Sequence, residues 1–156
     1  MAKRFGVMLD CSRNAVMLPE QIKEYVSLLQ SMGYNMLMLY TEDNYKISDE
    51  PYFGYLRGGY TEAELKEIAE YCHQIGVEVI PAIQTLAHID TIFRWGPYKA
   101  IHDIDNVMLA DEEATYRLIR KMFATVRACY PYSRIINIGL DEAHRLGLGR
   151  FLDKYG

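Results

Sequence analysis

The stretch that decides the expected fold reads Asn35-Met36-Leu37-Met38-Leu39-Tyr40-Thr41-Glu42-Asp43. Its central five residues form an unbroken apolar run, which is typical of a strand buried on both faces of a parallel sheet. Polar and acidic residues follow the run at once. In a parallel α/β fold the carboxyl ends of the strands are where sites are built. The stretch therefore predicts a strand over 35–41 that ends in functional side chains.

The same pattern recurs on both sides of this stretch. Short apolar segments over 5–10, 77–83 and 134–139 predict three more strands. Long segments with apolar residues at helical spacing separate the four strands. This β-α-β-α-β-α-β order favours an α/β fold with a parallel sheet built from right-handed crossovers. We expect strand order 1-2-3-4 and helices along one face of the sheet.

Turn and cap residues set the expected helix boundaries. Pro19 suits the first turn of the first helix, and Gly33 suits its end. A capping box over 61–64 opens the second helix, and Gly76 ends it. Asp111 is expected to cap the third. Residues 84–110 look irregular apart from a short helix near 86–93, and the chain ends inside a further helix.

Composition excludes several classes of function. Half of the 156 residues are hydrophobic, 24% are charged and the net charge is −4, with no basic run to attract nucleic acid. No stretch reaches the roughly 18 apolar residues of a membrane span. No glycine-rich nucleotide motif is present, so no cofactor is expected. The three cysteines, Cys11, Cys72 and Cys129, favour reduced thiols in a cytoplasmic protein over disulfides or a zinc site.

Reactive side chains follow each of the four predicted strands. Each has a structural alternative. Asp10 and Arg13 could form an ion pair at the rim, His88 could be a satisfied structural histidine, and the acids after the fourth strand could cap a helix. The side chains in strand order are Asp10 and Arg13; Thr41, Glu42 and Asp43; Gln84 and His88; Asp141, Glu142 and His144.

The adjacent acids Asp141 and Glu142 point first to glycoside hydrolysis. That reaction needs a proton donor and a group that stabilises the cationic anomeric carbon. Neighbouring residues of a regular strand face opposite sides, so the two acids can share a substrate only where the strand breaks. Gly139 is placed to allow that distortion.

Four segments together resemble the family 20 glycoside hydrolases, the β-N-acetylhexosaminidases. The resemblance runs in the family's order along the whole chain and is greatest to the exo-acting N-acetylglucosaminidases of streptococci and their relatives. Gly59-Tyr60-Thr61 also fits. The segments are Met8-Leu9-Asp10-Cys11-Ser12-Arg13, Tyr40-Thr41-Glu42-Asp43, Ile80-Pro81-Ala82-Ile83-Gln84-Thr85-Leu86-Ala87-His88 and Ile138-Gly139-Leu140-Asp141-Glu142-Ala143-His144.

The resemblance implies a role for each site residue. The substrate's own 2-acetamido oxygen acts as nucleophile, with net retention. Asp141 would hold and polarise the acetamido N–H, and Glu142 would protonate the leaving oxygen and then activate water. Arg13 would bind hydroxyls of the terminal sugar. Asp43 and His88 would form a dyad that supports the general acid.

The resemblance also implies a (β/α)₈ barrel that hydrolyses terminal, non-reducing β-N-acetylhexosamine residues, either N-acetylglucosamine or N-acetylgalactosamine. A full barrel takes about 250 residues, so residues 1–156 are expected to form its N-terminal half. The family's usual Gly-Gly-Asp-Glu has Leu140 here, and its Pro-Glu-Ile-Asp has Ala82 and Gln84. The acetamido pocket belongs to the later strands. The chain alone is therefore expected to be inactive.

Two other functions remain as alternatives. One is a non-catalytic half-barrel that self-associates, most simply as a dimer. The other is a metal-dependent hydrolase that uses Asp141, His88 and His144. Metal-dependent amidohydrolase barrels carry a His-x-His pair after the first strand, and residues 10–12 offer none, so no metal is expected.

Overall fold

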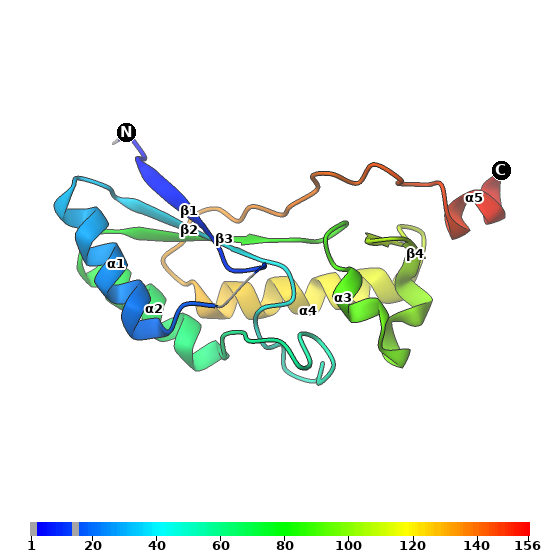
Figure 1. The fold of residues 1–156 in the computed structure, drawn as a ribbon, viewed down its shortest axis with the longest axis horizontal. Helices are drawn as coiled ribbons and strands as arrows, with labels where there is room; N and C mark the ends of the chain where they lie inside the picture. Colours follow the sequence, from blue (N-terminus) through cyan, green and yellow to red (C-terminus); the bar gives the residue numbers. More distant parts are fainter. Residues whose placement is uncertain (1–2, 14–15) are drawn as a thin grey trace.

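The computed structural model describes residues 3–13 and 16–156. Its centre is a three-stranded parallel sheet in the order β1-β2-β3 (Figure 1). The strands are β1 (Gly6–Asp10), β2 (Met36–Thr41) and β3 (Glu78–Ile83). The expected parallel sheet is thus confirmed for the first three strands.

Three long helices lie against one face of this sheet (Figure 1): α1 (Pro19–Ser31), α2 (Glu62–Gln74) and α4 (Glu113–Cys129). The capping box of α2 is confirmed, because Thr61 Oγ1 accepts a hydrogen bond from the Glu64 backbone N–H. The prediction that Asp111 caps the third long helix, α4, is wrong.

The side chain that caps α4 is that of Glu112, which accepts from the Ala114 N–H. Asp111 has other partners. Its Oδ2 accepts hydrogen bonds from Lys154 Nζ at 2.5 Å and from the Tyr155 hydroxyl at 2.7 Å. The two residues come from the end of the chain, which the sequence pattern of the helix could not reveal.

One-sided helix packing leaves the opposite face of the sheet partly open. On β2, Leu37, Leu39 and Thr41 face the helices and are buried, whereas Met36, Met38 and Tyr40 are only partly buried. The expectation of a strand buried on both faces is therefore wrong for β2. On β1 the open face is more exposed still, with Met8 at 55%.

No fourth strand forms at 134–139, contrary to the sequence pattern. A single parallel bridge joins Ala82 to Asn137. The next step of the ladder towards the amino end would need an N–H at Pro81, and proline has none. The Ile135 carbonyl accepts from Ser133 Oγ instead. In the other direction, the Gly139 N–H donates to the Asn137 side chain, so the ladder stops on both sides.

Residues 84–110 are more ordered than expected. The short helix α3 (Asp90–Phe93) lies inside the predicted range, and a 3₁₀ helix, η1 (Gly96–Ile101), follows it. An antiparallel hairpin of β4 (His102–Ile104) and β5 (Val107–Met108) was not predicted. Its strands are too short to show alternation, and its two-residue turn is stabilised by a left-handed Asp105, with φ of 47°.

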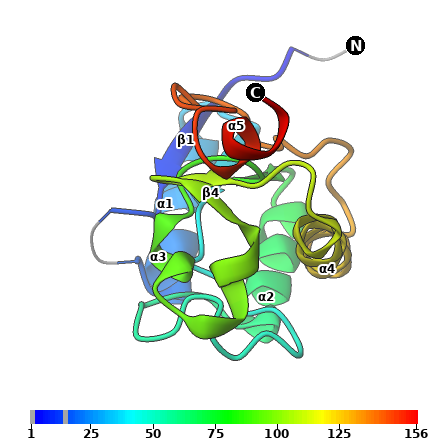
Figure 2. The ribbon, with the colours of Figure 1, turned by 90° about the vertical axis from the view of Figure 1, so that its right-hand side faces the viewer.

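The chain ends in α5 (Arg150–Tyr155), which confirms the expected terminal helix. Figure 2 shows α5 beside the hairpin, and the Phe151 N–H donates to Asp103 Oδ1 there at 2.9 Å. Among the described residues, no helix combines the length and the hydropathy needed to cross a bilayer. All three cysteines are buried and free.

Candidate active site

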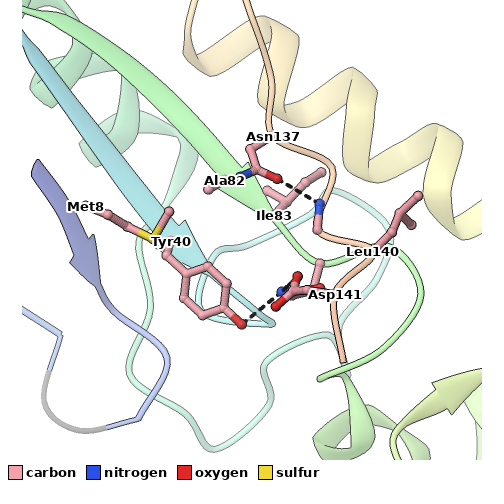
Figure 3. A pocket seen from close by; sticks show the side chains of 9 residues that line it. Met8, Tyr40, Ala82, Ile83, Asn137, Leu140 and Asp141 are labelled. Carbon is pink, nitrogen blue, oxygen red and sulfur yellow. Dashed lines mark hydrogen bonds between the residues drawn. The ribbon is translucent and has the colours of Figure 1, made fainter. Parts of the chain in front are cut away.

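The predicted site residues lie at the carboxyl end of the sheet. A pocket of about 310 Å³ opens there, between β2, β3 and the segment after Asn137 (Figure 3). Asp141 lies at one side of it and Tyr40 at the other. The lining residues are Met8, Tyr40, Ala82, Ile83, Gln84, Asn137, Gly139, Leu140 and Asp141.

Gln84 connects the two sides of this pocket. Its side chain is fully buried, and Nε2 donates to Asp141 Oδ1 and to the Tyr40 hydroxyl oxygen, both at 3.0 Å. The hydrogen bond from Gln84 lowers the pKa of Asp141 below its usual value. Asp141 is therefore ionised at neutral pH and presents its second oxygen, Oδ2, to a ligand.

Glu142 lies beside His88. The Nε2 atom of His88 is 3.3 Å from Glu142 Oε2 and 3.8 Å from Asp141 Oδ2. The two carboxyl side chains are about 60% exposed, at 59% for Asp141 and 63% for Glu142, whereas His88 is nearly buried. A single imidazole thus lies close to both acids, which remain accessible to a substrate.

The backbone around these residues is unusual. His88 and Glu142 both have left-handed conformations, with φ of 57° and 52°. Side chains other than glycine adopt this region at a cost, and such residues gather at functional sites. The backbone is distorted at Gly139, as expected from the sequence, although no regular strand precedes it; its φ is 54°. A Cβ there would stand 2.4 Å from the Ile83 carbonyl oxygen.

An ion-pair cluster forms around two buried carboxylates that directly follow β2. Arg13 Nη1 is 3.0 Å from Glu42 Oε1, and Arg57 Nη1 is 3.7 Å from Glu42 Oε2 and 2.8 Å from Asp43 Oδ1. Both carboxylate side chains are only 2% exposed. Burial raises the pKa of Glu42, and the two guanidinium groups and His88 oppose that rise.

Asp43 and His88 do not contact each other directly. Asp43 Oδ2 accepts from Thr91 Oγ1 at 2.5 Å, and Oδ1 meets Arg57. Within residues 3–13 and 16–156, no hydrogen bond joins Asp43 to His88. The structure thus brings His88 to the acids and Asp43 to the arginines, and the dyad stays a prediction.

The structural alternatives can be compared with the contacts. Asp10 Oδ1 accepts from the N–H and the hydroxyl of Ser12, both at 2.7 Å, and Arg13 pairs with Glu42 rather than with Asp10. No helix of the described chain begins at Asp141, so that residue and its neighbour are not a helix cap. Among the described residues, no three His, Cys, Asp or Glu side chains cluster as metal ligands.

Three contributors to the site have contacts that the sequence does not predict. Arg57 lies in the long loop between β2 and α2, where no periodicity marks it. Glu42 and Gln84 follow β2 and β3, as expected, but the sequence does not reveal their partners. The acidic pair Glu42-Asp43 at the end of an apolar strand was the available signal, since buried carboxylates need a cation nearby.

Comparison with known proteins identifies the family. The family model described as "Glycosyl hydrolase family 20, catalytic domain" matches residues 4–147 of the chain. This chain belongs to glycoside hydrolase family 20. A cattle (Bos taurus) protein named hexosaminidase D is 26% identical over 82% of the family 20 chain and 38% of its own length. A β-hexosaminidase of Vibrio furnissii is 27% identical over 88% of the chain and 28% of its own length.

Solved structures agree with this assignment. The β-N-acetylhexosaminidase of Streptomyces coelicolor matches with a TM-score of 0.76 and 25% identity, over 89% of the family 20 chain and 33% of that protein. A β-hexosaminidase variant of Streptomyces plicatus, solved with its product N-acetylglucosamine, matches equally well over 32% of its length. The (β/α)₈ fold class expected from the sequence is confirmed.

The chain spans 28–38% of the length of the two relatives named above. The described sheet is an arc of parallel strands of the kind that a half barrel contains. The extent of the domain, the roles of the individual site residues and the streptococcal-type assignment all stay predictions.

Proposed function

We propose that the protein containing this chain hydrolyses terminal, non-reducing β-N-acetylhexosamine residues, with N-acetylglucosamine or N-acetylgalactosamine as the released sugar. The proposal rests on one observation: Asp141, Glu142 and His88 lie close together at the carboxyl end of the sheet. The Streptomyces plicatus structure with bound N-acetylglucosamine supports the substrate class by similarity.

The two acids suit different steps of a substrate-assisted, retaining reaction. Ionised Asp141, oriented by Gln84, can accept a hydrogen bond from the acetamido N–H and so direct the acetamido oxygen at the anomeric carbon. Glu142 can donate its proton to the leaving oxygen and afterwards take a proton from water. His88 Nε2 lies 3.3 Å from Glu142 Oε2 and 3.8 Å from Asp141 Oδ2, so its imidazole can interact with both carboxylates in this proposal.

Arg13 supports the binding of the terminal sugar in this proposal. Its guanidinium group is 58% exposed at the edge of the site, while one amino group is held by buried Glu42. Its other N–H groups have no acceptor among the described residues, so in this proposal they donate to sugar hydroxyls. Asp43 supports the site indirectly, by fixing Arg57 under the same loop.

A chromogenic β-N-acetylglucosaminide tests this function. The protein that contains this chain is expected to release the chromophore with retention at the anomeric carbon. A protein that is folded yet cleaves neither the gluco- nor the galacto-configured substrate would contradict the proposal. The 156-residue chain alone is expected to show little or no turnover.

The second candidate function is a self-associating half barrel. Apolar side chains remain exposed on the open side of the sheet, and unpaired strand edges are templates for association. We propose that the isolated chain pairs two-fold through this side. The residues that support the proposal are Met8 at 55%, Ile135 at 45%, Ile138 at 41% and Leu140 at 55% exposure.

A further inference from the structure

A second pocket, of about 440 Å³, lies where the loops after β1, β2 and β3 meet. Three arginines line it, Arg13, Arg57 and Arg94. Only Arg13 has a proposed role in sugar binding. None of the residues that line the pocket is acidic. The remaining lining residues are neutral: Ser12, Asn44, Gly58 and Thr91.

The acids that balance these arginines lie beneath the pocket and do not line it. Glu42 and Asp43 are 2% exposed, and each contacts Arg57 from the buried side. The charged groups that line the pocket are therefore all guanidinium groups, although that of Arg57 also donates to the Ser12 carbonyl and to Asn44 Oδ1. Three arginines against two carboxylates leave a formal excess of one positive charge, in a chain whose net charge is −4.

Arg94 supplies the excess charge. Its Nε donates to the Thr91 carbonyl at 2.8 Å, which leaves the two terminal amino groups for a ligand. Among the described residues, no carboxylate lies within ion-pair distance of Arg94. A guanidinium group fits a carboxylate or sulfate oxygen pair by two parallel hydrogen bonds.

We propose that this pocket binds a negatively charged substituent of a glycan, either a sulfate ester or a carboxylate. The inference rests on the proposed function, because Arg13 belongs both to this pocket and to the expected terminal-sugar site. The pocket would thus select acidic glycans among the substrates of the same enzyme.

An aromatic surface next to the pocket supports a sugar rather than a free ion as the ligand. The Arg94 guanidinium carbon is 5.9 Å from the centre of the Trp95 ring. Tyr52 and Tyr55 pair with Trp95 at centroid distances of 5.7 and 5.1 Å, and the two tyrosines are 40% and 45% exposed. Aromatic faces beside a few placed polar groups are typical of small-molecule sites.

Calorimetric titration of the chain separates the ligands, and it needs no turnover. The probes are inorganic sulfate, N-acetylglucosamine, its 6-sulfate and 4-sulfate esters, and glucuronic acid. One acidic sugar is expected to bind more tightly than both sulfate and N-acetylglucosamine. Tighter binding of a sulfate ester or of glucuronic acid identifies which oxyanion the pocket takes.

Arg94→Ala is expected to weaken binding of the acidic sugar about tenfold, since it removes charge-assisted hydrogen bonds. Arg94→Lys keeps the charge and should lose only part of the affinity. Arg120→Ala is the matched control, because Arg120 is an exposed arginine on α4 that pairs with Glu113. It should bind like the unaltered chain.

Three results would overturn the proposal. The first is equal affinity for acidic and neutral sugars. The second is equal loss of affinity in Arg94→Ala and Arg120→Ala. The third is binding of inorganic sulfate without a preference for any acidic sugar, which would mean an adventitious ion only. The ratio of kcat/KM for sulfated over neutral chromogenic substrate, measured in the full-length protein, gives a second readout. Failure of hydrolysis alone would leave the titration unaffected.

Discussion

The Nε2 atom of His88 lies 3.3 Å from Oε2 of Glu142, and both residues hold a left-handed backbone conformation. Each conformation costs on the order of 1 kcal/mol or more for a side chain of this size. The loops after β3 and after Asn137 therefore hold two unfavourable conformations that bring an imidazole to a carboxyl group. Such an arrangement suits a proton donor that must keep one orientation.

Glu142→Gln in the full-length enzyme is expected to lower kcat by about 10²–10⁴-fold, because the amide keeps the shape and cannot donate the proton. Binding of substrate should change little. Steady-state kinetics with natural and activated leaving groups measures both effects. Glu113→Gln is the control, since Glu113 is equally exposed, at 65%, and lies on α4. Unaltered kcat in Glu142→Gln would refute the assignment.

Asp141→Asn is expected to weaken binding of an oxazoline-like inhibitor about tenfold, because the charge that attracts the acetamido N–H is lost. Inhibition constants of the full-length enzyme measure the change. Asp105→Asn is a suitable control, since Asp105 is 53% exposed and pairs with Arg145 outside the site. Inhibition that stays the same in Asp141→Asn would count against its role.

Arg57→Ala is expected to destabilise the fold by about 3 kcal/mol, because Glu42 and Asp43 would remain buried without their shared cation. Chemical denaturation measures this loss. Removing Arg57 also raises the pKa of Glu42 further, since burial then acts against fewer positive charges.

The loss of stability in Arg57→Ala is expected to depend on pH. Burial raises the pKa of Glu42, so the penalty of Arg57→Ala is largest where Glu42 is ionised and shrinks as the pH falls and Glu42 takes up a proton. The difference in unfolding free energy between the variant and the unaltered chain should therefore be larger at pH 7 than at pH 4. A difference that is independent of pH, or one matched by the exposed control Arg120→Ala, would show that the cluster does not act this way.

Gly139→Ala is expected to destabilise the chain by more than Gly76→Ala. Both glycines have positive φ, at 54° and 78°, so both variants lose about 1 kcal/mol for the left-handed backbone. Around Gly76 no atom lies within 4 Å of the added Cβ, whereas at Gly139 the Ile83 carbonyl is at 2.4 Å. Equal midpoints of unfolding would contradict the close approach at Gly139.

Sedimentation equilibrium tests the half-barrel proposal. The isolated chain has a mass of 18.1 kDa, and a dimer at tens of micromolar is expected from the exposed face around Met8 and Leu140. Met8→Lys should shift the chain towards monomer, while Leu28→Lys, at an equally exposed position on α1, should not. A monomer in the unaltered chain would contradict the proposal.

The parts of the fold that could be predicted are those set by local pattern. The three strands, the helices on one face and the capping box at Thr61 follow from apolar spacing and turn residues. The segment 134–139 has the same apolar character but lacks a regular partner, because Pro81 offers no N–H. Strand formation depends on the donors of the neighbouring strand, which a pattern within one segment does not contain.

The candidate site divides in a similar way. Asp141, Glu142 and His88 lie close together, as predicted, although the segment before the two acids forms no regular strand. The roles of Arg57 and Thr91 could not be predicted, because their contacts with Asp43 join residues that lie 14 and 48 positions apart in the sequence. Such contacts come from the packing of loops, for which the sequence holds no period.

Because Pro81 has no N–H, few backbone hydrogen bonds protect the neighbouring segment 134–140 from amide hydrogen exchange. The backbone hydrogen bonds that join residues 134–140 to β3 are those of Asn137 with Pro81 and Ile83 and a long one, 3.4 Å, from Thr85 to Gly139. Strand β2 is paired on both sides. The amides of 135–140 should therefore exchange with solvent by local opening, long before those of β2. The segment that leads directly to both acids would behave as a unit of its own, attached to a more protected sheet.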